Sequence, residues 1–187
     1  MRREPLAGLV LAVAVLAGCG SRRASGPVRI YQAACSDSTY TQPAKTPLST
    51  AEALRLGPVV FNDLPPGQDV VRPSRQFPYY AVPTFLDVLT SARRGVTITV
   101  SSRSGRIALA YPEDLWARLA SGKATLADGA RGVHFPVCRN PSTSAPLITQ
   151  YGASIYLPAP GCFTLRVQPV GSRRSYAATI RALVAHC

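Results

Sequence analysis

The chain is poor in acidic residues, in aromatic residues and in long apolar runs, and each shortage excludes a class of protein. Nine Asp and Glu residues stand against 21 Lys and Arg residues, so the formal net charge is +12. Aromatic residues make up 7% and do not alternate with arginines, which argues against a nucleic-acid-binding platform. The apolar run at residues 6–17 is shorter than the roughly twenty residues that cross a bilayer. The charge balance therefore favours anionic partners other than nucleic acid.

Motifs that mark common enzymes and metal sites are also missing. The chain has no G-x-S-x-G, H-E-x-x-H or G-x-x-x-x-G-K-[ST] motif and no C-x-x-C pair. A catalytic set around His134 or His186 is possible in principle, but both histidines lie in strand-like runs and are better interpreted as structural. The seven acidic residues after Cys19 other than Asp37 are scattered along the chain, and they leave open the alternative of a facing pair of carboxylates in a glycosidase-like site. They are Glu52, Asp63, Asp69, Asp87, Glu113, Asp114 and Asp128. We predict no catalytic residue, no metal and no cofactor.

The first nineteen residues predict export. Arg2 and Arg3 precede the apolar run, as in the first two regions of a secretory signal peptide. Leu16-Ala17-Gly18-Cys19 resembles the lipobox of bacterial lipoproteins, and this resemblance implies a lipid on the Cys19 thiol and cleavage just before it. The alternative is a secreted protein in which Cys19 is incidental. Several acyl chains on one cysteine give stable attachment, whereas a single chain is marginal.

The predicted organisation has three parts. Residues 1–18 form the signal peptide, residues 19–26 form the lipidated cysteine and a flexible tether, and residues 27–187 form one domain. Arg22 and Arg23 in the tether are expected to contact an anionic lipid surface. The expected location is the extracytoplasmic face of the cell membrane. Removal of the signal peptide leaves eight acidic against nineteen basic residues, which is a net charge of +11.

Four cysteines remain beside Cys19, and an even number in an exported chain predicts two disulfides. A strand register that places residue 170 opposite residue 179 would bring Cys162 opposite Cys187. We therefore favour Cys162–Cys187 with Cys35–Cys138. The rival scheme pairs Cys35 with Cys187 and Cys138 with Cys162, because terminal strands often pair.

The remaining pattern predicts a mainly β domain. Residues 96–101 alternate apolar and polar side chains, which indicates a strand with one solvated face. Residues 102–105 are expected to form a hairpin turn, and one short helix is expected between Pro112 and Gly122. The other expected strands are residues 28–34, 54–61, 82–88, 106–111, 132–138, 153–157, 163–170 and 176–187. Eight or nine short strands with Pro- and Gly-rich turns favour an antiparallel β-sandwich.

Proline-rich segments interrupt this pattern. Residues 36–53 and 62–80 are expected to be long loops, and Gly57-Pro58 limits its strand to an edge or a bend. The second loop ends in Phe77-Pro78-Tyr79-Tyr80. These aromatic residues could form a ligand platform, but we favour the interpretation that they cover an open edge of the core.

Several short segments resemble small exported proteins of actinobacteria. They are Leu56-Gly57-Pro58-Val59-Val60-Phe61, Leu126-Ala127-Asp128-Gly129, Val133-His134-Phe135 with Cys138, Tyr151-Gly152, Pro160-Gly161-Cys162, and Leu165, Val167 and Cys187. Those proteins look like lipoproteins or secreted single domains with an immunoglobulin-like β-sandwich and no assigned activity. The resemblance implies the same fold and compartment and adds no catalytic residue.

Three functions are consistent with these observations. The one we favour is a non-enzymatic binding or scaffold module at the outer face of the membrane. The others are an envelope hydrolase with an unrecognised site, and a secreted inhibitor or chaperone-like factor that uses the two long loops. Two turns that carry paired arginines are expected to be exposed: Arg93 with Arg94, and Arg173 with Arg174. Their charge either serves only to keep the domain soluble or contacts anionic lipid or wall polymer. Arg103 and Arg106 bracket a further turn. The sequence does not identify a protein partner.

Overall fold

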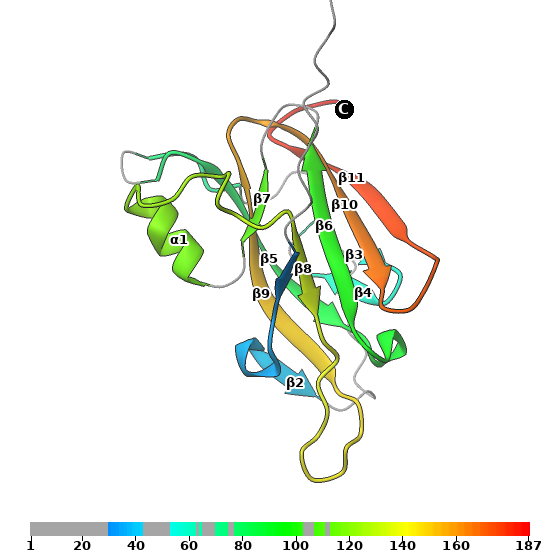
Figure 1. Cartoon of the computed structure of the whole chain (residues 1–187). Coiled ribbons are helices and arrows are strands. Elements are labelled where there is room, and N and C mark those ends of the chain that lie inside the picture. The colour runs from blue at the N-terminus through cyan, green and yellow to red at the C-terminus, as the bar shows by residue number, and fades with distance from the viewer. Residues whose placement is uncertain are drawn as a thin grey trace, which may run out of the picture.

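We describe a computed structural model of the chain, which covers residues 30–42, 53–62, 64, 70–74, 77–102, 107–110 and 113–187. Within these ranges the protein is mainly β, with two sheets and one α-helix, α1 (Glu113–Ala120). Figure 1 shows α1 on one side of the sheets and the last strand along the opposite side. The expected mainly β sandwich with a single short helix is confirmed.

The first sheet has five strands in the order β1-β8-β6-β10-β11. Side chains of its central strands alternate between the core and the outer face. In β6, Val96, Ile98 and Val100 are buried, whereas the intervening threonines are half-buried. This is the period-2 pattern expected of a sheet with one solvated face. The strands are β1 (Ile30–Gln32), β6 (Val96–Ser102), β8 (Gly132–Phe135), β10 (Gly161–Pro169) and β11 (Tyr176–Ala182).

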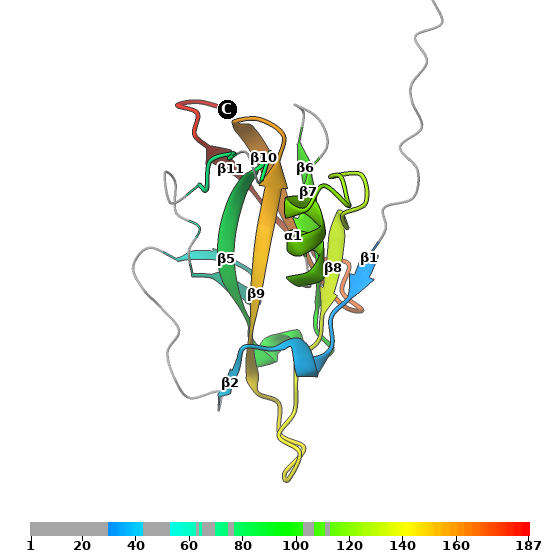
Figure 2. The same ribbon diagram turned by 90° about the vertical axis from the view of Figure 1, so that its left-hand side faces the viewer.

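The second sheet has six strands in the order β2-β9-β5-β4-β3, and β7 also pairs with β9. Its two long strands, β5 and β9, lie side by side in both views (Figures 1 and 2). Gly57-Pro58 forms the turn between β3 and β4, so the expected bend at this dipeptide is confirmed. The strands are β2 (Tyr40–Gln42), β3 (Leu54–Leu56), β4 (Val59–Phe61), β5 (Tyr80–Val88), β7 (Ala108–Ala110) and β9 (Ile148–Leu157).

The main core lies between the sheets, and a smaller apolar cluster lies under α1. The main core contains fully buried side chains from both sheets, such as Ile98 and Leu165 from the first and Leu86 from the second. In the smaller cluster, Phe77 packs against Tyr156 with ring centroids 5.4 Å apart, and Leu119 of α1 is buried with them. The aromatic segment at residues 77–80 therefore contributes Phe77 and Tyr79 to this cluster, which favours a structural role over a ligand platform.

Three sequence predictions about strands are corrected. Residues 106–111 were expected to form a hairpin with the preceding strand, but β7 pairs with β9 in the other sheet. The buried side chains of Ile107, Ala108 and Leu109 explain this, because a strand that is apolar on both faces fits between the main core and the α1 cluster. The loop expected at 36–53 contains β2, and the strand expected at 176–187 ends at Ala182.

The first sheet is also not wholly antiparallel. β1 runs parallel to β8, with Ile30 opposite Gly132, whereas the other strand pairings are antiparallel. The described ranges contain eleven strands rather than the expected eight or nine, because β2 was not expected and the segment at residues 54–61 divides into β3 and β4. Two 3₁₀ turns complete the fold, η1 (Cys35–Asp37) and η2 (Thr90–Ala92). η2 joins β5 of the second sheet to β6 of the first.

Candidate functional site

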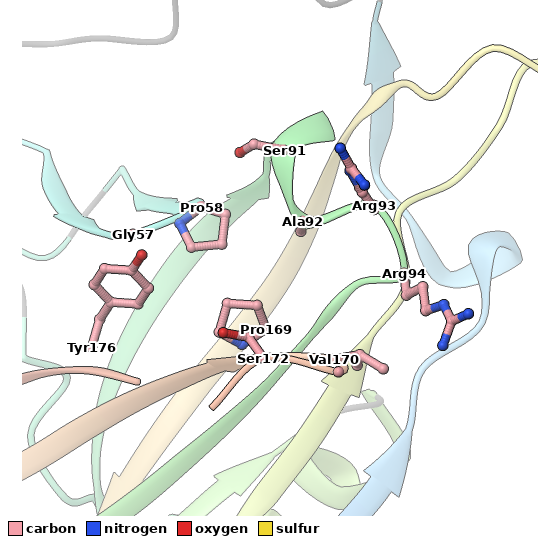
Figure 3. Close-up of a pocket in the computed structure, with 11 residues that line it drawn as sticks. Gly57, Pro58, Ser91, Ala92, Arg93, Arg94, Pro169, Val170, Ser172 and Tyr176 are labelled. Atoms are coloured by element: carbon pink, nitrogen blue, oxygen red, sulfur yellow. The ribbon is translucent and has the colours of Figure 1, made fainter. Parts of the chain in front are cut away.

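Three chain reversals meet at one end of the sandwich and enclose a groove of about 660 Å³. The β3–β4 turn forms one wall, η2 and the residues after it form the second, and the β10–β11 turn forms the third. Figure 3 shows the Tyr176 ring beside Gly57 and Pro58 on one side, with Arg94 directed outward on the opposite side. The full lining is Gly57, Pro58, Ser91, Ala92, Arg93, Arg94, Pro169, Val170, Gly171, Ser172 and Tyr176. We name this feature the arginine groove.

Backbone hydrogen bonds hold the three reversals together. The Leu89 amide donates to the Pro58 carbonyl over 2.9 Å, which ties the start of η2 to the β3–β4 turn. The Val170 amide donates to the Gly95 carbonyl over 3.1 Å, which ties the end of β10 to the exit of η2. Because these bonds join segments far apart in sequence, the groove is a product of the fold rather than of any one loop.

Glycine is required where the Tyr176 ring enters the groove wall. Gly57 has φ +61°, a left-handed conformation that other residues adopt only at a cost. A Cβ at this position would also overlap the Tyr176 ring. The β3–β4 turn can therefore hold the tyrosine ring against its backbone only with glycine at position 57.

The structure places both predicted arginine pairs at this end. Arg93 and Arg94 line the groove, and Arg173 and Arg174 follow Ser172 in the β10–β11 turn. All four residues are exposed, as predicted. The Arg174 guanidinium lies 5.0 Å from the centroid of the Tyr176 ring, within the range of a cation–π interaction.

The groove is positively charged and partly apolar. None of the lining residues carries a carboxylate, and two of them are arginines. Tyr176, Pro58 and Pro169 supply flat apolar walls, while Ser91 and Ser172 supply hydroxyl groups. Guanidinium groups bind phosphate and carboxylate groups through paired hydrogen bonds. The arrangement suits an anionic group attached to a body that can pack against the walls.

Both favoured disulfides are confirmed. Cys35 bonds Cys138, and Cys162 bonds Cys187, each with Cα atoms 5.7 Å apart. The Cys138 sulfur also lies 3.4 Å from the hydroxyl of the fully buried Tyr151. The first bond joins the segment after β1 to the segment after β8.

The strand register that suggested the second bond is wrong. Cys162 lies opposite Arg181 in the β10–β11 ladder, not opposite Cys187. The chain leaves β11 at Ala182, and Leu183 adopts φ +58°. The remaining residues then bring Cys187 back to Cys162, which a pure strand pattern does not predict.

The two histidines have structural surroundings. His134 is half-buried in β8, and its burial lowers the pKa of the imidazole below the ordinary value of 6.5. His186 is exposed next to the Cys162–Cys187 disulfide. In the part of the chain that the structure describes, no cluster of three or more His, Cys, Asp or Glu side chains is placed to bind a metal ion.

One buried polar site was not predicted. Asp87 is 1% exposed and accepts hydrogen bonds from the Asn62 side-chain amide at 2.6 Å and the Gln150 side-chain amide at 3.1 Å. Thr39 in turn contacts the Gln150 side-chain oxygen at 3.3 Å. The alternation of side chains along β5 indicates only the direction of the Asp87 side chain, which lies on the face opposite Leu86 and Val88. Its amide partners come from distant segments and could not be read from the sequence.

Several predicted residues lie outside the described ranges. These are Cys19 with its signal peptide, Arg22 and Arg23 of the tether, and Arg103 and Arg106. Among the helices of the described ranges, none is long and apolar enough to cross a membrane. No family model, curated protein or solved structure matches the chain.

Proposed function

We propose that the protein is a lipid-anchored module of the cell envelope that binds an anionic group in the arginine groove. The observation that carries the proposal is that the exposed residues Arg93 and Arg94 line a groove without acidic residues, while the exposed pair Arg173–Arg174 directly follows the lining residue Ser172. The lipobox-like Leu16–Cys19 segment supplies the anchor, and the two disulfides suit an oxidising compartment outside the cytoplasm.

The length of chain between Cys19 and Ile30 allows two sources of the anion. Cys19 precedes the first described strand residue, Ile30, by 30 − 19 = 11 positions. A fully extended chain of that length spans at most about 40 Å. The ten residues of β9 span roughly 33 Å, so the tether can bring either end of the sandwich to the membrane. Phosphate groups of lipid headgroups and of wall polymers are both within reach.

Competition between membrane and polymer distinguishes these sources. The lipidated full-length protein is placed in nanodiscs of neutral lipid or of anionic lipid, and soluble polyphosphate is titrated as the probe. Binding should weaken as salt rises above about 0.15 M, where charges are screened beyond roughly 8 Å. If polyphosphate binds more weakly in anionic discs than in neutral discs, the groove binds lipid headgroups. If it binds equally in both, the ligand of the groove is a wall polymer. Absence of polyphosphate binding in neutral discs would refute the anion-binding proposal.

The anchoring proposal has a separate test. Cys19→Ser removes the thiol that the lipid requires, so the variant should remain an uncut precursor without lipid. Inhibition of the lipoprotein signal peptidase should likewise retain residues 1–18 in the unaltered protein. Mass spectrometry of the N-terminal peptide measures both effects. A Cys19→Ser protein that loses residues 1–18 and still enters the detergent phase would contradict lipid anchoring at Cys19.

A further inference from the structure

β11 is a long strand at an open edge of the sandwich. The other edge positions in the described sheets are held by three-residue strands, namely β1, β2, β3 and β7, whereas β11 has seven residues and no proline. Figure 1 shows β11 along the outer margin of the molecule, on the side opposite α1. Natural sheets usually protect their edges with short strands, prolines or lysines, because a free edge accepts further strands. β11 is neither short nor interrupted by proline, it has no lysine, and its one charged residue is Arg181.

The free hydrogen-bonding groups of β11 can be assigned to particular residues. The backbone amide of Val170, the residue after β10, points toward the β6 side, because it donates to the Gly95 carbonyl. The side toward which the backbone N–H and C=O groups point alternates from residue to residue along an antiparallel strand. The backbone groups of Phe163, Leu165 and Val167 in β10 therefore point toward β11. Their partners on β11 are Ile180, Ala178 and Tyr176, whose backbone groups form the hydrogen bonds with β10. The backbone groups of the residues between these partners point away from β10. The outward backbone groups belong to Ala177, Thr179 and Arg181.

None of the described residues occupies these outward groups. The backbone hydrogen bonds between loops and strands include no bond to residues 177, 179 or 181 from the side away from β10. The same three residues are exposed. The edge therefore offers alternate amide and carbonyl pairs over a span long enough for an added strand.

The two faces of β11 differ in chemistry. Tyr176, Ala178 and Ile180 are half-buried and pack against the main core at the open edge. On the outer face, Arg181 belongs to β11, and Arg166 lies on β10 opposite Ala177. An added strand would cover apolar side chains on its inner face and meet arginines on its outer face.

The arginines of the outer face have only neutral partners in the described ranges. Arg166 donates to the Ser175 hydroxyl over 3.1 Å, and Arg181 donates to the Ala185 carbonyl over 2.6 Å. Arg174, which precedes the strand, instead stacks on Tyr176 of the inner face. Their charge is therefore left for an acidic partner, since opposite charges across neighbouring strands stabilise a sheet and like charges destabilise it.

We propose that β11 binds an extended segment of a partner protein in which apolar residues alternate with Asp or Glu. The segment adds to the first sheet as a further strand, with backbone hydrogen bonds that supply affinity and alternate side chains that supply selectivity. A second copy of this chain fits less well, because β11 against β11 brings together arginines and two domains of equal positive charge. This surface is distinct from the arginine groove, although Tyr176 contributes to both.

The test uses the full-length protein in neutral detergent and a labelled, capped peptide of about eight residues that alternates Val and Glu, close to a typical strand length. Fluorescence anisotropy measures its affinity. Thr179→Pro removes one outward amide and leaves the ladder with β10 intact, because proline is tolerated where the amide would face solvent. We expect this change to weaken binding of the Val/Glu peptide about tenfold or more, because it removes one backbone hydrogen bond and disturbs the adjacent ones. Thr179→Val keeps the amide and should bind like the unaltered protein.

Charge exchange and hydrogen exchange complete the design. The double variant Arg166→Glu with Arg181→Glu should lose the Val/Glu peptide and bind a Val/Lys peptide instead. Bound peptide should slow amide exchange at residues 177, 179 and 181, while residues 178 and 180 are slow in the free protein. If circular dichroism shows that Thr179→Pro is unfolded, Ala177→Pro takes its place.

Three results would overturn the proposal. One is peptide binding that both proline variants leave unchanged, and another is protection confined to residues outside β11. The third is concentration-dependent dimerisation that Thr179→Pro abolishes while the Val/Glu peptide does not bind, because the edge would then serve a second copy.

Discussion

Gly57 is the residue on which the wall of the arginine groove depends most directly. Gly57→Ala forces a side chain into a left-handed conformation at a cost of about 1–2 kcal/mol. Its new Cβ also displaces the Tyr176 ring, and overpacking of this kind adds roughly 1–3 kcal/mol. We expect lower stability in urea unfolding and weaker polyphosphate binding.

Gly171 provides the matched control for this prediction. Gly171→Ala faces a similar backbone cost at φ +79°, but no atom lies within 4 Å of the place that the new Cβ would occupy. It should therefore destabilise less than Gly57→Ala. Equal losses of unfolding free energy in Gly57→Ala and Gly171→Ala would show that the contact between position 57 and Tyr176 does not contribute to stability.

His134 predicts how stability depends on pH. Burial lowers the folded-state pKa of this imidazole below 6.5, so the unfolded chain binds the proton more readily. The contribution of His134 is therefore fully present above the unfolded pKa and is lost as pH falls through the folded pKa. His134→Gln should flatten the dependence of the urea midpoint on pH below about 6.5. An unchanged slope in His134→Gln would contradict this assignment.

Burial of single polar residues was the part least accessible from the sequence. The alternation of β5 predicts the outward direction of Asp87, but outward residues are ordinarily solvated. Its burial depends on Asn62 and Gln150, which lie 25 and 63 positions away. Only the paired strands β4, β5 and β9 bring these side chains together.

At the scale of elements, the two disulfides should contribute unequally. Cys35–Cys138 spans 103 positions and Cys162–Cys187 spans 25. In the chain-entropy account these loops correspond to about 4.7 and roughly 3.5 kcal/mol. Replacing Cys35 and Cys138 together by alanine should therefore lower the free energy of unfolding more than replacing Cys162 and Cys187. The buried position of Cys138 beside Tyr151 adds to the difference.

Urea unfolding of the two double-alanine variants measures this order. The pair of variants is its own control, because each removes two cysteines and one bond. A larger loss for the Cys162–Cys187 variant would mean that the C-terminal segment, rather than the link between β1 and β8, stabilises the sandwich.

Long alternating strands were predictable, whereas the short strand β2 was not. The patterns at β6 and β10 each extend over enough residues to show period 2, and both strands were predicted close to their observed bounds. β2 has three residues, too few for a period to appear. β7 was recognised as a strand but assigned to the wrong partner, since its apolar residues do not show which sheet they join.

At the scale of the whole molecule, topology creates the candidate site. The sequence predicted that Arg93, Arg94, Arg173 and Arg174 lie in exposed turns, and this is confirmed. It did not predict that the turns meet. Their meeting follows from the pairing of β6 with β10, which sets Val96 opposite Pro169 and aligns the two turns at one end. Register between strands so far apart in the sequence leaves no local signal.

The central claim is that the arginine groove, and not net charge, binds anions. The most direct test compares Arg93→Glu with Arg94→Glu against Arg118→Glu with Arg131→Glu, two exposed arginines outside the groove lining. Both double variants change the net charge equally. Titration of full-length protein with polyphosphate in neutral nanodiscs should show loss of about tenfold or more in affinity for the groove variant and little change for the control. Equal losses in the two variants would contradict the claim, because binding would then reflect overall charge alone.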